Sequence, residues 1–117
     1  MITHPKTEEL VQSVALWIDQ IRPTLDPRNA FLARVAANAL ATVGRELTVG
    51  PAAEAEAVRL LAALLGGEAP FEELNAELCA RIREGRMSVE TPGLLPALRE
   101  IAFAQLAIDQ PSYKHEL

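Results

Sequence analysis

Two arginines and an asparagine at helical spacing are the residues of this sequence best suited to binding an anion. Arg34 and Asn38 are four residues apart, so one turn of helix would place both side chains on the same face. Arg45 follows two turns later. A guanidinium and an amide at this spacing can hold one carboxylate or phosphate group. The alternative is structural, because amides near apolar stripes, such as Asn38, Asn75 and Gln105, must also find hydrogen bonds within the fold.

The sequence offers no arrangement typical of nucleophilic or metal catalysis. Its two histidines, His4 and His115, lie near opposite ends, where a base is poorly placed to activate a serine or cysteine. No Glu-x-x-His motif, the signature of a helical di-metal centre, is present. Cys79 is expected to be a small buried side chain. The sequence therefore predicts no catalytic residues, no cofactor and no metal site.

The distribution of charge argues against nucleic acid as a partner. The formal net charge is −5, and residues 51–80 contain six glutamates against one arginine, so the acidic excess lies there. Several of these glutamates fall in expected first turns of helices, where the helix dipole favours anions. Binding to nucleic acid requires a stripe of basic residues, which is absent.

The excess of arginine over lysine, nine to two, and the absence of targeting signals favour a bacterial cytoplasmic protein. Half of the residues are hydrophobic, yet no apolar run approaches the roughly 18 residues of a membrane span. The first residues lack the basic and apolar regions of a signal peptide. A single cysteine cannot form an internal disulfide. We therefore expect a cytoplasmic protein with no membrane segment.

The elements that must position these side chains are helices. Alanine and leucine, which favour helices, dominate the hydrophobic residues, and no segment alternates with the period of a strand. Prolines, glycines and N-cap residues divide the chain into five expected helices at about 7–21, 26–47, 52–65, 70–84 and 91–109. Short connections favour an antiparallel bundle. We predict one all-α domain over residues 1–117, with tails of about 1–6 and 111–117.

The second expected helix, with Asp26 as N-cap and an end before Gly50-Pro51, is apolar nearly all round. Its main stripe comprises Leu32, Val35, Ala36, Ala39, Leu40, Val43 and Leu47. A second face consists of the small residues Ala30, Ala33, Ala37, Ala41 and Gly44. Such a helix is usually buried, so we expect this Ala-rich helix at the centre of the bundle. Its small face would admit another backbone closely, from this chain or from a second copy.

Three large apolar residues fall outside the stripes of their helices: Leu16, Leu60 and Phe103. Single exposed apolar residues are ordinary, but three in a small bundle suggest a contact surface. We predict that they contribute to a homo-oligomer or to binding of another protein.

Two strings carry a resemblance to a known family. Arg34-Val35-Ala36-Ala37-Asn38-Ala39-Leu40 and Leu106-Ala107-Ile108-Asp109 before Pro111 resemble an all-helical bacterial domain family of unknown function. The resemblance extends from the first helix to Tyr113. It implies a genomic context beside, or fused to, aminoglycoside-phosphotransferase-like kinases and acyl-CoA dehydrogenases. It supplies no catalytic residues.

Three hypotheses follow. The favoured one is a non-catalytic accessory or interaction domain that serves a phosphotransferase-like or acyl-CoA-dehydrogenase-like protein. The second is a bundle that binds an acyl or CoA ester, with Arg34 and Arg45 at the acidic end. The third, an independent enzyme, would require a deep pocket with a coupled acid and base.

Overall fold

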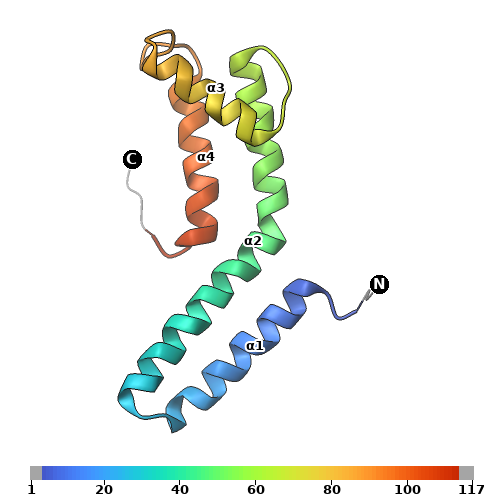
Figure 1. The fold of residues 1–117 in the computed structure, drawn as a ribbon, viewed down its shortest axis with the longest axis vertical. Coiled ribbons are helices and arrows are strands. Elements are labelled where there is room, and N and C mark those ends of the chain that lie inside the picture. The colour runs from blue at the N-terminus through green and yellow to red at the C-terminus, as the bar shows by residue number, and fades with distance from the viewer. Residues whose placement is uncertain (1–3, 114–117) are drawn as a thin grey trace. The chain divides into compact units, whose positions relative to one another are not determined.

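The computed structural model describes residues 4–113, and its regular elements are helices joined by short loops (Figure 1). The α-helices are α1 (Thr7–Ile21), α2 (Pro27–Leu65), α3 (Phe71–Arg83) and α4 (Leu94–Asp109). A short 3-10 helix, η1 (Arg22–Thr24), follows α1. No strand occurs in this part of the chain. The prediction of an all-α fold is confirmed, whereas the expected tails fall partly on residues 1–3 and 114–117, outside the described residues.

Three helix ends follow local sequence rules. Asp26 caps α2 by accepting the backbone N–H of Asn29 at 3.2 Å and its side-chain amide at 2.6 Å. Gly66 and Gly85 follow α2 and α3 with φ of 85° and 76°, the left-handed conformation that glycine adopts readily. Thr91, the N-cap that the sequence predicts for the helix expected over 91–109, does not cap α4, which begins after Gly93. Its hydroxyl oxygen instead accepts the backbone N–H of Ser88 at 2.9 Å.

The expected break at Gly50-Pro51 is also wrong, because α2 continues through Pro51 as one 39-residue helix. The four α-helices therefore replace the five that were predicted. A proline inside a helix removes one hydrogen bond and costs about 3 kcal/mol. The next six residues are four alanines and two glutamates, all strong helix formers; Ala57, the last of them, and Leu61 one turn later are buried. This packing offsets the missing bond.

The contacts nevertheless divide the chain at the same dipeptide. One compact unit comprises residues 1–50 and the other residues 51–117, named here unit 1 and unit 2. This division describes how contacts are distributed along the chain. It does not test the expected single domain over 1–117, which stays a prediction.

Unit 2 contains a conventional hydrophobic core. Leu61, Leu74, Leu78, Met87 and Leu94 are buried together, so the C-terminal part of α2 packs with α3 and α4. The apolar stripes of the expected helices 52–65, 70–84 and 91–109 include Leu61, Leu74, Leu78 and Leu94, so the sequence predicts the burial of these four leucines. Met87, in the loop after α3, has no periodicity that could have indicated its burial.

Unit 1 is a helical hairpin in which α1 and the N-terminal part of α2 run antiparallel, side by side (Figure 1). The small-residue face of α2 packs against α1: Ala37 is buried, and a Cβ built on Gly44 would lie 3.9 Å from a methyl carbon of Val11. The sequence left open whether this face packs on a helix of the same chain or of a second copy. In the structure it packs on α1 of the same chain.

The expected burial of the main stripe of α2 is wrong. Four of its large side chains, those of Leu32, Val35, Val43 and Leu47, are 39–49% exposed. The physical reason is geometric, because a helix with one neighbour buries one face. The closest approach between two helices favours the face with the smallest side chains. The N-terminal part of α2 is therefore not the buried central helix that the sequence suggested.

Candidate functional site

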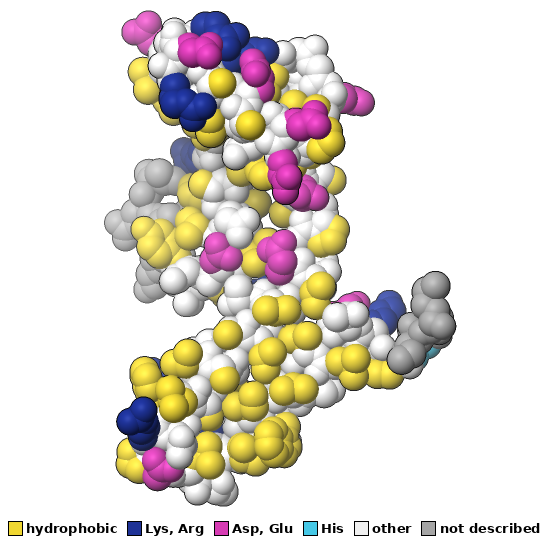
Figure 2. Space-filling view, in the orientation of Figure 1, with side chains coloured by type: hydrophobic (Ala, Val, Ile, Leu, Met, Phe, Trp, Pro, Cys, Tyr) yellow, Lys and Arg dark blue, Asp and Glu magenta, His cyan; other side chains and the backbone are white. Residues whose placement is uncertain are grey.

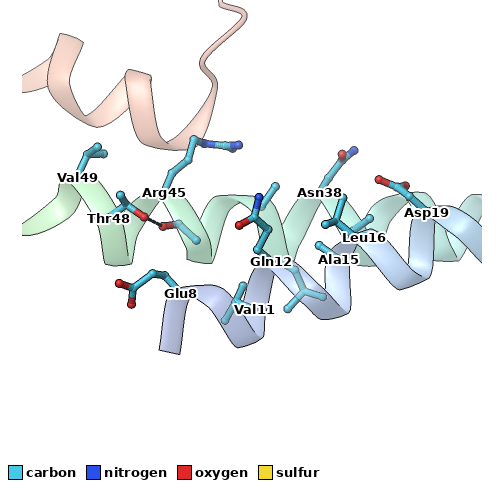
Figure 3. Close-up of a pocket in the computed structure, with 14 residues that line it drawn as sticks. Glu8, Val11, Gln12, Ala15, Leu16, Asp19, Asn38, Arg45, Thr48 and Val49 are labelled. Carbon is cyan, nitrogen blue, oxygen red and sulfur yellow. Dashed lines mark hydrogen bonds between the residues drawn. The ribbon is translucent and has the colours of Figure 1, made fainter. Parts of the chain in front are cut away.

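A groove of about 620 Å³ lies between α1 and α2 in unit 1 (Figure 3). The small face of α2 creates it, because alanine and glycine leave space beside the helix contact. The apolar residues of its lining are Val11, Ala15, Leu16, Ala37, Leu40, Ala41 and Val49. Both helices therefore contribute to one apolar channel along the hairpin.

Polar side chains from both helices line the same groove (Figure 3). Helix α1 contributes Glu8, Gln12 and Asp19, and α2 contributes Asn38, Arg45 and Thr48. The Arg45 guanidinium donates to the hydroxyl of Thr42 at 3.2 Å. The Thr48 hydroxyl donates to the carbonyl of Gly44 at 2.6 Å. These bonds within α2 hold the arginine and the threonine along one side of the groove.

The structure brings together two of the three residues expected to bind an anion. Asn38 and Arg45 line the groove, whereas Arg34 is exposed and is not part of the lining. Two carboxylates, Glu8 and Asp19, accompany the single guanidinium. An anionic group placed in the groove would meet these negative charges as well as Arg45. The groove is therefore better suited to an uncharged apolar group than to a free carboxylate or phosphate.

The three residues expected to form an interface lie in different environments. Leu16 is exposed in unit 1 and lines the groove. Leu60 and Phe103 belong to unit 2, where both are partly buried. The Phe103 ring lies 5.1 Å from the guanidinium carbon of Arg99, a cation–π contact along α4.

Sequence reasoning missed a larger exposed surface on unit 1, here called the apolar face. It consists of Leu10, Val14 and Trp17 on α1 and Leu32, Val35, Val43 and Leu47 on α2, each 39–58% exposed. Figure 2 shows hydrophobic side chains spread over both helices of this hairpin. The sequence predicts the four α2 residues on the buried main stripe, and it places Leu10, Val14 and Trp17 on one apolar face of the expected helix 7–21 at the spacing of a packed helix. The available signal was that α2 has more apolar faces than one neighbouring helix can cover.

Helix geometry places the apolar face and the groove on opposite sides of the hairpin. At about 100° per residue, the exposed stripes of α1 and α2 each lie roughly a quarter to a third of a turn from the helix contact. Viewed along each helix from its N-terminus, the rotation from the helix contact to the exposed stripe has the same sense. Because the helices are antiparallel, the two stripes fall on one side of the hairpin, and the polar lining of the groove falls on the other.

Perturbed pKa values occur at structural contacts. The side-chain amide of Asn29 lowers the pKa of the Asp26 carboxyl. Hydrogen bonds from Arg59 and Arg81 lower the pKa of Glu56 and Glu77, respectively. None of these groups lines the groove, so their perturbation reflects helix caps and ion pairs.

Within residues 4–113, no cluster of three histidine, cysteine or carboxylate side chains could hold a metal ion. Over the same range, no helix combines the length and apolar content needed to cross a membrane. Cys79 is exposed, so the expectation of a buried thiol is wrong.

A family model described as a domain of unknown function, DUF6285, matches residues 23–113. The chain belongs to the DUF6285 family. The match begins within η1, after α1, and covers helices α2, α3 and α4 of this DUF6285 chain. The expected resemblance to a family of unknown function is confirmed over these residues, and the expected genomic neighbours stay a prediction. Comparison with curated proteins and with solved structures gave no match.

Proposed function

We propose that this DUF6285 chain is a non-catalytic, cytoplasmic interaction module. It self-associates and serves a phosphotransferase-like or acyl-CoA-dehydrogenase-like protein. One observation carries the proposal, namely the apolar face of unit 1, whose seven large side chains are 39–58% exposed. Contiguous exposed apolar surface of this extent is typical of protein-binding sites.

The two expected partner classes rest on the family resemblance of the sequence. The test uses purified chain mixed with phosphotransferase-like and acyl-CoA-dehydrogenase-like proteins from the same genome, analysed by size-exclusion chromatography with light scattering. Co-elution with a protein of either class, at a fixed stoichiometry, is the expected result. A chain that is monomeric at all concentrations and co-elutes with neither class would overturn the proposal.

The groove supports a second candidate function, the binding of an acyl or CoA ester. Its apolar lining suits an acyl chain, and Arg45 is the cation in reach of an acidic end. This candidate ranks second because Glu8 and Asp19 share the lining.

Thermal unfolding in the presence of acyl-CoA esters of several chain lengths tests the second candidate. Binding predicts stabilisation that Arg45→Gln reduces, while the control Arg34→Gln, outside the groove, retains it. If no ester of any length changes the melting temperature, the candidate is excluded.

A further inference from the structure

We infer that the apolar face of unit 1 is the interface between two copies of this chain, which pack their helical hairpins into a four-helix bundle. The inference rests on the self-association in the proposed function and specifies its surface, its geometry and its register. A two-fold axis relates the copies and sets each α2 antiparallel to the partner's α2.

The first reason is that the hairpin lacks a core of its own. Among residues 4–50, only Ala37 and Gly50 are buried. Unit 2, in contrast, buries five large side chains in one cluster. Helices of this length are stabilised mainly by packing of their apolar faces, so a two-helix hairpin with its largest side chains in water requires a cover.

The second reason is the amount of apolar surface available. From the exposed fractions, the seven large side chains of the apolar face and the intervening Ala36 and Ala39 offer on the order of 700–800 Å² per copy. A standard stable interface buries about 800 Å² on each partner. Two copies packed by this face therefore reach the area that a specific dimer needs.

The third reason is the spacing of the exposed residues. Leu10, Val14 and Trp17 follow one another at intervals of four and three residues. On α2, the exposed residues Leu32, Ala36, Ala39, Val43 and Leu47 follow one another at intervals of four, three, four and four, and the exposed Val35 lies beside Ala36. This is the seam by which helices of coiled coils and four-helix bundles interlock. Each helix thus has one seam used inside the hairpin and a second seam that is uncovered.

The fourth reason is the distribution of charge, which favours a second copy of this chain as the partner that covers the apolar face. The stripe of α2 has no charged residue between Leu32 and Val43, so identical faces meet without like charges at their centre. Beyond each end of this segment an exposed charged residue lies on the outer flank of α2: Arg28 at one end and Glu46 at the other. Neither belongs to the ion pairs found among the described residues.

These two charges fix the register of the pair. When two copies of α2 lie antiparallel with their midpoints at Ala37, Arg28 comes level with the partner's Glu46, and Leu32 lies within one residue of the level of the partner's Val43. Each dimer then forms the charge pair twice. Residues 28 and 46 are about 27 Å apart along one helix, so they cannot pair within a chain.

Sedimentation equilibrium of the purified chain, with charge-reversal variants, tests the inference. Wild type is expected to sediment as two copies of the 12.7 kDa chain. Arg28→Glu and Glu46→Arg should each weaken the dimer by about tenfold, because each places like charges opposite one another twice. The double variant R28E/E46R should restore wild-type affinity, since the pairs are then reversed.

Two further variants locate the interface. Val35→Glu, in the centre of the apolar face, should abolish the dimer, whereas Leu95→Glu, at an exposed leucine of α4 in unit 2, should leave it unchanged. Circular dichroism checks that each variant remains helical.

A wild-type chain that is monomeric at every concentration would overturn both this inference and the self-association it rests on, and would leave the face to another protein. A wild-type dimer that is insensitive to Val35→Glu, or whose charge-reversed double variant stays weak, would overturn this interface while self-association stands.

Discussion

Individual side chains differ widely in how much they stabilise this protein, and the difference follows from how deeply each side chain is buried. Leu61 is 1% exposed at the centre of the unit 2 core, whereas Leu95 on α4 is 50% exposed. The sequence predicted the position of Leu61, because its stripe and those of the neighbouring helices agree. It could not predict the positions of Met87 or Cys79, since burial of a single residue off a stripe depends on tertiary packing.

Leu61→Ala should lower the free energy of unfolding by about 2–5 kcal/mol, because it removes buried methyl groups and leaves a cavity. The matched control Leu95→Ala should cost less than about 1 kcal/mol. Urea unfolding followed by circular dichroism measures both. Equal effects of the two variants would show that Leu61 is not a core residue.

The cap at the start of α2 predicts a dependence of stability on pH. Asp26 accepts hydrogen bonds from Asn29, and these lower its pKa in the folded protein. Because its pKa is lower in the folded state, the ionised carboxylate stabilises the folded protein at pH values above the unfolded pKa, near 3.9. This stabilisation is lost as the pH falls through the folded pKa. Asp26→Ala should therefore reduce the melting temperature at neutral pH, and the difference from wild type should narrow as the pH falls below the unfolded value. A difference that is constant with pH would contradict this role of the carboxylate.

At the scale of the elements, the sequence predicted that helices form but not which of their faces are covered. The caps at Asp26, Gly66 and Gly85 follow from local chemistry. The continuation of α2 through Pro51 does not, because packing beyond the proline outweighs a local penalty. The covered face of α2 was also misjudged, since both its small face and its leucine and valine stripe are apolar. Only the position of α1 decides between them.

The contact between the two helices of unit 1 can be tested at Gly44. A methyl group there would lie at an ordinary distance of 3.9 Å from Val11, so Gly44→Ala should stabilise α2 by up to about 1 kcal/mol through its helix propensity. Gly44→Leu should instead push α1 away and cost about 1–3 kcal/mol. Thermal unfolding distinguishes the two. If leucine is tolerated as well as alanine, α1 does not pack on this face.

At the scale of the whole molecule, unit 1 has two separate surfaces, the groove and the apolar face. Asn38 and Arg45 were recognised from their spacing, and they lie in the groove. The apolar face was recognised as apolar but was assigned to the interior, because periodicity does not distinguish a core shared within a chain from one shared between chains. Since the groove lies on the opposite side of the hairpin, a dimer formed through the apolar face would leave it open.

The single tryptophan of the chain gives the most direct measurement of the central claim, that the apolar face is covered in solution. Trp17 is 58% exposed in one copy. Val11 contacts the position of Gly44, so Ile18 and the adjacent Trp17 lie near the level of Ala37, where the two-fold axis would pass. The account predicts blue-shifted Trp17 emission and weak quenching by acrylamide in concentrated protein, both reverting on dilution as the dimer dissociates. The emission of a water-exposed tryptophan, unchanged from dilute to concentrated protein, would contradict it.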